Sequence, residues 1–445
     1  MSEKETIIAG YKDFLDNGKT ERECVLTSIE ILKEYGYKDL AEVIAAKEPI
    51  TKGSRFYYNY MGKSLVIFNI GEEPLENGLR ILGAHMDSPR LDIKQNPLYE
   101  EEKLAYFDTH YYGGIKKYHW VTIPLAIHGV IAKKDGSVLN ISIGEREDDP
   151  VFCITDLLIH LSGEQLGKNA AKVIEGEKLD VLIGGTPLKD EEKDAVKANI
   201  LDILKKCYDI EEKDFISAEL EVVPAGKSRD LGFDRSMILA YGQDDRICAF
   251  ASLCAILSEP DVKKTSCCLL VDKEEIGSVG ATGMRSKFFE NILAELLEAM
   301  GEYSELKLRR CLARSEMLSS DVSAGFDPLY AGVFDKRNSA FLGKGMVFNK
   351  YTGSKGKNGS NDANAEYIAK LRAALDEKGI VYQTAELGKV DAGGGGTIAY
   401  IMALYGMNVI DCGVAVMSMH APWEVSNKED IYNTVCGYRA FLQMQ

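Results

Sequence analysis

The chain has 445 residues, which is enough for two or three domains with a sizeable core. Its net charge of −16, from 53 basic and 69 acidic side chains, argues against nucleic acid or an anionic membrane as a partner. No run approaches the roughly 18 apolar residues of a membrane span, and the first residues do not resemble a signal peptide. The ten cysteines include no Cys-x-x-Cys pair, so we expect no structural zinc-thiolate site. From the absence of a signal peptide and a membrane span we expect a reduced, cytoplasmic protein without disulfides.

The N-terminal part of the chain predicts a helix followed by strands. Thr20 and Glu23 have the spacing of a capping box, and apolar residues follow them at helical intervals. Residues 55–70 alternate as strands do. Residues 79–84 form a short continuous apolar run that ends at His85, which is typical of a strand buried on both faces.

The pattern changes from about residue 97. Residues 106–143 contain strands rich in aromatic side chains, and the charged stretch 190–214 predicts an amphipathic surface helix. We therefore expect residues 97–232 to form an inserted β-rich dimerisation domain. The catalytic domain would then be discontinuous and comprise residues 1–96 and 233–445.

After residue 232, expected strands alternate with expected helices. The four expected strands are residues 238–241, 267–271, 316–320 and 409–416. Such alternation indicates an α/β domain with a mostly parallel sheet flanked by helices. The segment 352–361, rich in Gly, Ser, Lys and Asn, predicts an exposed loop.

Five residues that can bind a metal stand at or just after the ends of the expected strands: His85, Asp244, Glu275, Asp321 and His420. Ligands tend to bind at the carboxyl ends of parallel strands, and zinc accepts imidazole nitrogen and carboxylate oxygen. Two metals about 3.5–4 Å apart can activate water and polarise a carbonyl. Glu274 is not one of these five ligands, so it would be free to take a proton from the bound water and pass it to the leaving amine. The pattern predicts a two-metal hydrolase.

Each of these motifs also has a simpler interpretation. Asp244-Asp245 before a helix is more often an N-cap, and a Glu-Glu pair is more often a solvated surface feature. Glu274-Glu275 differs because an apolar strand precedes it and three glycines follow within nine residues. Five such residues in one α/β domain are much less probable by chance than any one of them.

Several motifs occur in the order expected for one family: residues 83–89 (Gly-Ala-His-Met-Asp-Ser-Pro), Asp244-Asp245, residues 274–278 (Glu-Glu-Ile-Gly-Ser), Ser320-Asp321 and Met419-His420. Over nearly its whole length the chain closely resembles the aspartyl aminopeptidase family of dinuclear zinc aminopeptidases.

The resemblance implies a role for each matching residue. His85 and Asp321 would bind one zinc ion, Glu275 and His420 the other, and Asp244 would bridge the two. Glu274 would be the general base, and Asp87 would orient the ring of His85. Cobalt or manganese could replace zinc, because both site affinity and metal availability matter.

His160 has two interpretations. On pattern alone, it lies in an apolar helical stretch and is a buried structural histidine. In relatives, the matching histidine reaches into the active site of a neighbouring subunit. The resemblance therefore implies a homo-oligomer with shared sites, a tetrahedral dodecamer built from dimers.

Two segments are candidates for substrate binding. Gly394 and Gly395 belong to a glycine-rich loop before an expected helix, where free amides can hold an anion or a carbonyl oxygen; a flexible turn is the alternative. Acid-selective relatives have a lysine after a strand that contains Lys-Gly. Here Lys344 lies in the Lys-Gly pair, the aligned position is Asn349, and Lys350 follows. A shift of one residue in a strand reverses the side chain's face, so neutral or basic N-terminal residues are an alternative to acidic ones.

The predicted function is a cytoplasmic metalloaminopeptidase that removes N-terminal residues from peptides, with two zinc ions per subunit and no nucleic-acid or membrane partner. One alternative is another two-metal amidohydrolase, such as a carboxypeptidase or a deacylase. A second alternative is a catalytically silent shell protein that keeps the fold.

Overall fold

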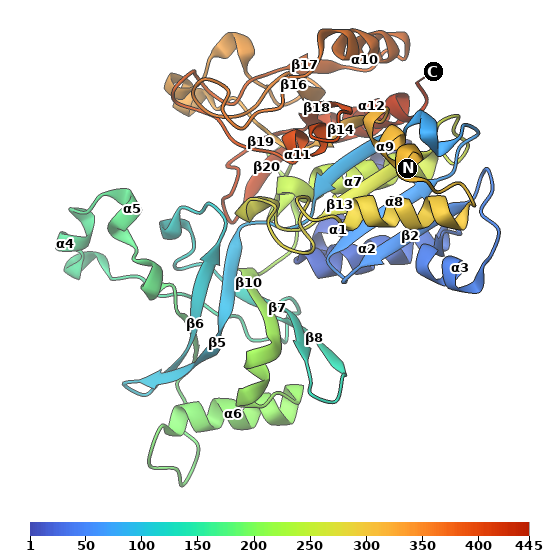
Figure 1. Ribbon diagram of the computed structural model, residues 1–445. Helices are drawn as coiled ribbons and strands as arrows, with labels where there is room; N and C mark the ends of the chain where they lie inside the picture. Colours follow the sequence, from blue (N-terminus) through green and yellow to red (C-terminus); the bar gives the residue numbers. More distant parts are fainter. Residues whose placement is uncertain (445) are drawn as a thin grey trace. The chain divides into compact units, whose positions relative to one another are not determined.

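The computed structural model describes residues 1–444, which divide by their internal contacts into two compact units. The first unit comprises Met1–Asp87, Ser228–Met419 and the chain from Glu424 onward, and the second comprises Ser88–Lys227 and His420–Trp423. Figure 1 labels the helices and strands and colours them from the N-terminus in blue to the C-terminus in red. Among residues 1–444 there is no helix with the length and apolar character needed to cross a membrane.

The first unit is built on a nine-stranded sheet whose four central strands, β13, β4, β14 and β18, are parallel. Antiparallel pairs occur toward both edges, so the predicted α/β class is confirmed with a mixed sheet. In spatial order the strands are β1 (Lys38–Asp39), β2 (Arg55–Tyr60), β3 (Ser64–Asn69), β13 (Ser266–Val271), β4 (Arg80–His85), β14 (Glu316–Ser320), β18 (Asn408–Gly413), β16 (Met346–Asn349) and β17 (Tyr382–Thr384).

The central strands are buried on both faces, as the apolar run before His85 predicted. In β4, Leu82 and Ala84 belong to one hydrophobic cluster and Ile81 belongs to another, because successive side chains point to opposite faces. Helices α1, α2, α7, α10 and α12 contribute to the first cluster, and α3, α8, α9 and α11 contribute to the second. The sheet is therefore covered by helices on both faces.

The helix expected after Thr20 is present and begins at Glu21. Thr20 accepts a hydrogen bond from the backbone N–H of Glu23 at 3.2 Å, and the Glu23 carboxylate accepts one from Thr20 N–H at 3.0 Å, which confirms the capping box. The helices are α1 (Glu3–Asn17), α2 (Glu21–Glu34), α3 (Leu40–Ala46), α7 (Gln243–Ser258), α8 (Phe288–Ala299), α9 (Glu305–Ala313), α10 (Ala365–Glu377), α11 (Ala399–Ala403) and α12 (Lys428–Leu442).

A second sheet in the first unit has five strands: β11 (Arg229–Leu231), β12 (Met237–Ala240), β20 (Glu424–Asn427), β19 (Ala415–Met417) and β15 (Ser323–Ala324). The strand expected over residues 409–416 is divided between the two sheets, as β18 and β19. The chain changes sheet just after Gly413. A Cβ atom there would lie 2.1 Å from the carbonyl oxygen of Asp321, so only glycine permits this close approach.

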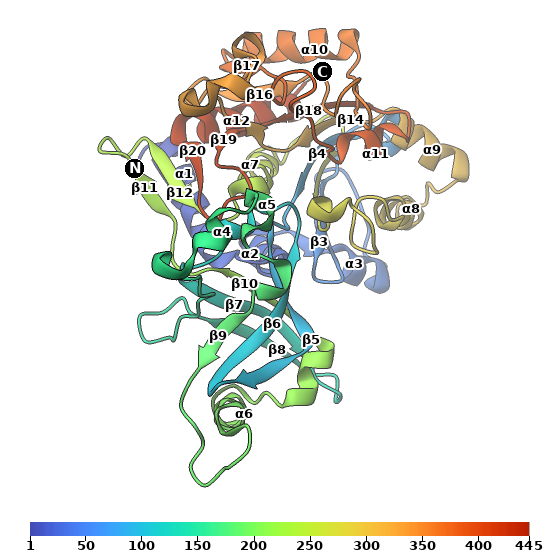
Figure 2. The ribbon, with the colours of Figure 1, turned by 90° about the vertical axis from the view of Figure 1, so that its left-hand side faces the viewer.

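The second unit contains a six-stranded sheet in which every pair is antiparallel (Figure 2). Its strands are β8 (Val138–Ile143), β7 (Leu125–Ala132), β10 (Ala218–Pro224), β5 (Arg90–Glu101), β6 (Leu104–Tyr112) and β9 (Val181–Gly184). Its helices are α4 (Gly163–Leu166), α5 (Ala170–Val173) and α6 (Ala195–Tyr208). The last lies within the charged stretch that predicted a surface helix.

Candidate metal centre

His85 is the last residue of β4 and is 1 % exposed. Its ring Nδ1 lies 2.9 Å from the backbone carbonyl oxygen of Asp87, and since a carbonyl oxygen only accepts, Nδ1 donates. Nε2 is then the nitrogen whose lone pair is available to a metal. A histidine oriented in this way by its second nitrogen is the usual arrangement for a metal ligand.

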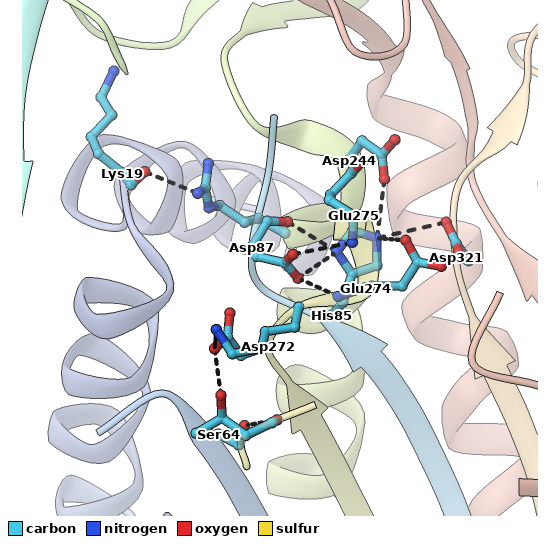
Figure 3. A network of polar contacts seen from close by, with 12 residues as sticks. Lys19, Ser64, His85, Asp87, Asp244, Asp272, Glu274, Glu275 and Asp321 are labelled. Atoms are coloured by element: carbon cyan, nitrogen blue, oxygen red, sulfur yellow. Dashed lines mark hydrogen bonds and ion pairs between the residues drawn. The ribbon is translucent and has the colours of Figure 1, made fainter. Parts of the chain in front are cut away.

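Three carboxylates surround Nε2 of His85 (Figure 3). It lies 3.3 Å from Oδ1 of Asp244, 3.9 Å from Oδ1 of Asp321 and 4.0 Å from Oε2 of Glu274. β13, β4 and β14 are parallel neighbours, so the segments that follow them meet at one edge of the sheet. This topology brings together residues that are more than 200 positions apart in the sequence.

Asp87 connects His85 to the Glu274-Glu275 pair. Its carboxylate, fully buried, accepts hydrogen bonds from the backbone N–H groups of Glu274 at 3.1 Å and Glu275 at 3.2 Å. The same carboxylate lies 3.4 Å from Nδ1 of His85. From the resemblance, Asp87 was expected only to orient the ring of His85. The sequence did not predict its hydrogen bonds to the backbone of Glu274 and Glu275.

Burial and negative charge dominate the electrostatics of this cluster. Burial alone would lower the pKa of His85, but Asp244 and Asp87 raise it well above its usual range. Burial raises the pKa of Asp321 well above its usual range, and the nearby carboxylate of Asp245 raises it further. Buried carboxylates so close together are costly unless a cation offsets their charge.

The donor set fits zinc. One ligand atom from each of His85, Asp244 and Asp321 lies within 4.8 Å of the others, and a ligand atom of Glu275 lies within 4.8 Å of one from Asp244. Imidazole nitrogen and carboxylate oxygen are both ordinary zinc ligands. A divalent ion here would compensate the accumulated negative charge.

His420 lies three residues after the end of β19 and four residues before the start of β20. By its contacts the short segment His420–Trp423 is grouped with the second unit. Within that unit, Nδ1 of His420 lies 2.9 Å from the carbonyl oxygen of Gly114, so Nδ1 donates and Nε2 keeps its lone pair. His420 thus has the same donor arrangement as His85.

The candidate substrate residues lie in two parts of the first unit. Gly394 and Gly395 lie in the loop before α11, and the backbone N–H of Gly353 donates to the carbonyl oxygen of Gly395 at 2.7 Å. Lys344 is exposed just before β16, and Lys350 is exposed just after it. The structure does not bring these two lysines into the cluster around His85.

His160 lies in a short 3-10 turn, Ile159–Leu161, of the second unit and is exposed. The interpretation from pattern alone, a buried structural histidine, is therefore wrong. Ile159 and Leu161 are each 68 % exposed, so the apolar run that suggested burial lies on the surface instead. An exposed apolar run gives the same sequence pattern as a buried one.

The comparisons with known proteins identify the family of the chain. Residues 14–442 match the family described as aminopeptidase I zinc metalloprotease (M18). A probable M18 family aminopeptidase 1 of Clostridium acetobutylicum is 63% identical over 433 residues, which cover 97% of this chain and 93% of that protein. The crystal structure of an M18 family aminopeptidase from Thermotoga maritima is 45% identical, covers 100% of this chain and 97% of that one, and has a TM-score of 0.96.

A more distant solved structure, the mApe1 dodecamer of S. cerevisiae, has the same fold. It is 21% identical, covers 99% of this chain and 97% of that one, and has a TM-score of 0.79. The family match and the bacterial relatives extend over nearly the whole chain. The chain thus belongs to the M18 family of aminopeptidase I zinc metalloproteases and is a zinc-dependent aminopeptidase.

Proposed function

We propose that the chain removes N-terminal residues from peptides at a centre of two zinc ions. His85 and Asp321 bind one ion, Glu275 and His420 bind the other, and Asp244 bridges them. The observation that carries this proposal is the position of Asp244: its Oδ1 lies 3.3 Å from Nε2 of His85, and it also has a ligand atom within 4.8 Å of one from Glu275. A carboxylate between two such ligands can serve both metals.

When bound, the zinc pair supplies Lewis-acid activation of water and of the scissile carbonyl. Glu274 is the general base: its carboxylate accepts the proton of the water and delivers it to the leaving amine. Oε2 of Glu274 lies 4.0 Å from Nε2 of His85, at the edge of the cluster. Asp87 accepts a hydrogen bond from the backbone N–H of Glu274, and this bond fixes the position of the backbone that carries the Glu274 carboxylate.

The chain's connectivity supports His420 as the last ligand. Both neighbours of its segment, β19 and β20, belong to the first unit. His420 is three positions after Met417, so three Cα–Cα steps place its Cα within about 11 Å of the end of β19. Its ring is oriented by the carbonyl oxygen of Gly114, which leaves Nε2 as the donor.

The charge of the centre favours a free amine over a free carboxylate as the terminal group recognised. The side chains gathered around His85 are Asp87, Asp244, Glu274, Glu275 and Asp321, all of them acidic. Two bound zinc ions would supply +4 against these five carboxylates, so the loaded centre would keep a small negative charge that favours a substrate ammonium. A carboxypeptidase, by contrast, needs a cation for the substrate's carboxylate.

The region around β16 favours a preference that extends beyond acidic N-terminal residues. Asn349 is buried and accepts a hydrogen bond from the hydroxyl of Ser323 at 2.9 Å, whereas Lys350 is exposed. Neutral N-terminal residues therefore fit at least as well as acidic ones. Hydrolysis rates for Asp-, Leu- and Lys-aminoacyl substrates test this, and a strong Asp preference that Lys350→Ala abolishes would contradict it.

We also propose a homo-oligomer, a dodecamer built from dimers, in which His160 reaches a neighbouring subunit's site. Exposed apolar side chains flank His160, among them Leu158, Ile159 and Leu161, and such a surface favours burial against another chain. The solved dodecamer of the S. cerevisiae relative supports the assembly through its shared fold. The molar mass in solution and the turnover of His160→Ala test it: a fully active monomer would contradict the proposal.

One assay distinguishes the proposed function from its alternatives. The zinc-loaded protein is given one peptide in two forms, with a free amine and with an N-acetyl group, and the products are identified by mass spectrometry. We expect loss of the N-terminal residue from the free-amine form alone, and no reaction after a chelator has removed zinc. Cleavage of the acetylated form alone would indicate a deacylase, release of the C-terminal residue a carboxypeptidase, and no cleavage a silent shell protein.

A further inference from the structure

We infer that Glu424 is a positioning residue for Asp244 and thereby controls the affinity of the centre for both metal ions. The inference rests on the proposed role of Asp244 as the bridging ligand. It concerns a carboxylate that binds no metal itself and lies at the start of β20, in the smaller sheet of the first unit.

The contact is direct and buried. Oε2 of Glu424 accepts a hydrogen bond from the backbone N–H of Asp244 at 3.0 Å, and Glu424 is 1 % exposed. β20 pairs with β12 in the register Ala240 opposite Glu424. The pairing of β20 with β12 therefore places Glu424 next to the short segment that connects β12 to Asp244.

Gln243, the residue before Asp244, is tied to the same strand. Its side-chain amide donates to the carbonyl oxygens of Glu424 at 2.7 Å and Ile238 at 3.3 Å. Its Oε1 accepts from the hydroxyls of Ser426 at 2.5 Å and Tyr11 at 3.2 Å. All hydrogen-bonding groups of this fully buried amide are thus engaged, so the backbone entering Asp244 has little freedom.

The local backbone explains why such support is needed. Gly242 has φ of 70°, and Asp244 has φ of −82° and ψ of 107°, which are not helical values although Asp244 lies in the first turn of α7. The Asp244 N–H therefore lies before the regular turns of α7, and a buried backbone N–H needs an acceptor. Glu424 supplies that acceptor.

The network reaches the N-terminal helix through Tyr11, which lies in α1 and is buried. Its hydroxyl bond to Gln243 joins residues 232 positions apart. The conformation of a metal ligand thus depends on packing between α1, α7 and β20. Loss of the Tyr11 hydroxyl removes one of four bonds to Gln243 and should have a smaller effect than loss of the Glu424 carboxylate.

Because Asp244 is proposed to bind both metal ions, a change in its orientation should affect both metal sites. A residue that orients one terminal ligand affects one metal, whereas a residue that orients the bridge affects both. Residues that support metal ligands typically change metal affinity by about 10- to 100-fold when they are mutated. Glu424→Ala should therefore weaken both zinc sites by a factor in this range.

The test is competition for zinc between the full-length protein and a chromophoric chelator, which gives the stoichiometry and the affinity of each site. The variants are Glu424→Ala, Glu424→Gln and Tyr11→Phe. Glu429→Ala is the control, because Glu429 is a half-exposed surface residue paired with Lys4. We expect two weakened sites in Glu424→Ala, substantial rescue in Glu424→Gln, whose amide oxygen still accepts, and wild-type binding in the control.

Other results would overturn the inference. Wild-type affinity at both sites in Glu424→Ala, or weakening of one site alone, would show that Glu424 does not control the bridge. If Glu424→Ala does not fold, Glu424→Asp decides, because its shorter side chain cannot keep the hydrogen bond from Asp244 N–H; wild-type zinc affinity at both sites in that variant would overturn the inference. A wild-type protein that binds one zinc per chain would instead contradict the two-metal proposal, and weakening of that single site in Glu424→Ala would still support the contact with Asp244.

Discussion

The carboxylate of Asp87 accepts a hydrogen bond from the backbone N–H of Glu274 at 3.1 Å. Asp87 follows β4 by two residues and Glu274 follows β13 by three, so this bond joins the ends of two adjacent parallel strands. Asp87 also accepts from Glu275 N–H and lies beside the ring of His85. One buried carboxylate therefore sets the relative positions of a proposed metal ligand and the proposed general base.

Asp87→Asn should impair both zinc binding and turnover. An amide has a single acceptor oxygen, so its NH₂ group would face one of the two backbone N–H groups that the carboxylate binds. We expect zinc affinity to fall by about 10- to 100-fold and turnover at saturating zinc to fall as well. Asp39→Asn is the control, since Asp39 accepts from Ala41 N–H at 2.8 Å but lies outside the centre. Unchanged zinc affinity in Asp87→Asn would show that Asp87 is only a structural cap.

Glu274→Gln should keep zinc and lose activity. The amide retains the size of the side chain but cannot accept a proton from water, so we expect turnover to fall by about 10²- to 10⁴-fold. Glu275→Gln is the contrasting variant, because it should lose zinc as well as activity. Zinc content and turnover are measured on the same samples. Wild-type turnover in Glu274→Gln would remove this residue from the role of general base.

The glycine-rich loop before α11 should tolerate a methyl group at one position and not at another. Gly394 has φ of 127°, and a Cβ there would lie 2.2 Å from the carbonyl oxygen of Gly353. Gly396 has no heavy atom within 4 Å of its added Cβ. We expect Gly394→Ala to raise KM or lower kcat, and Gly396→Ala to have a much smaller effect. Equal kinetics for the two variants would indicate that the loop does not shape the substrate pocket.

Asp430, at the start of α12, should make stability depend on pH. Burial raises its pKa to about 6, and hydrogen bonds from the N–H groups of Gly343 and Gly345 oppose this with a smaller effect. A folded-state pKa above the unfolded value of about 3.9 favours folding below about pH 4, and this contribution is lost as pH rises through about 6.

Asp430→Asn cannot ionise, so the free energy of unfolding of the wild type relative to this variant should decrease between about pH 4 and 7. Urea denaturation of both proteins across this range measures the difference. Asp234→Asn should give a nearly constant difference across this range, because hydrogen bonds from Ser236 lower the pKa of Asp234 and its carboxyl is ionised in the folded protein throughout. A difference for Asp430→Asn that stays constant or increases with pH would contradict the assignment.

Features encoded locally were predictable from the sequence. The apolar run before His85 became a buried strand, and the spacing of Thr20 and Glu23 became a capping box, because both signals lie within a few residues. The expected insertion, 97–232, begins nine residues after Ser88 and ends five residues after Lys227, the limits of the main segment of the second unit. β5 begins at Arg90, before the change in composition that suggested a boundary.

Contacts between distant residues were not predictable in this way. Asp87 and Glu274 are 187 positions apart, and Asp244 and Glu424 are 180 apart, so no periodicity links them. His160 shows a second limit, because an exposed apolar run cannot be distinguished from a buried one by pattern alone. The division of residues 409–416 between two sheets depended on the contact of Gly413 with Asp321.

The most direct test of the two-metal centre is a crystal structure of the zinc-loaded protein with anomalous diffraction at the zinc edge. We predict two peaks per chain about 3.5–4 Å apart, with the Asp244 carboxylate between them, His85 and Asp321 on one ion, and Glu275 and His420 on the other. Glu274 should contact neither ion directly. A single peak, or a second peak that lacks Glu275 and His420, would contradict the account.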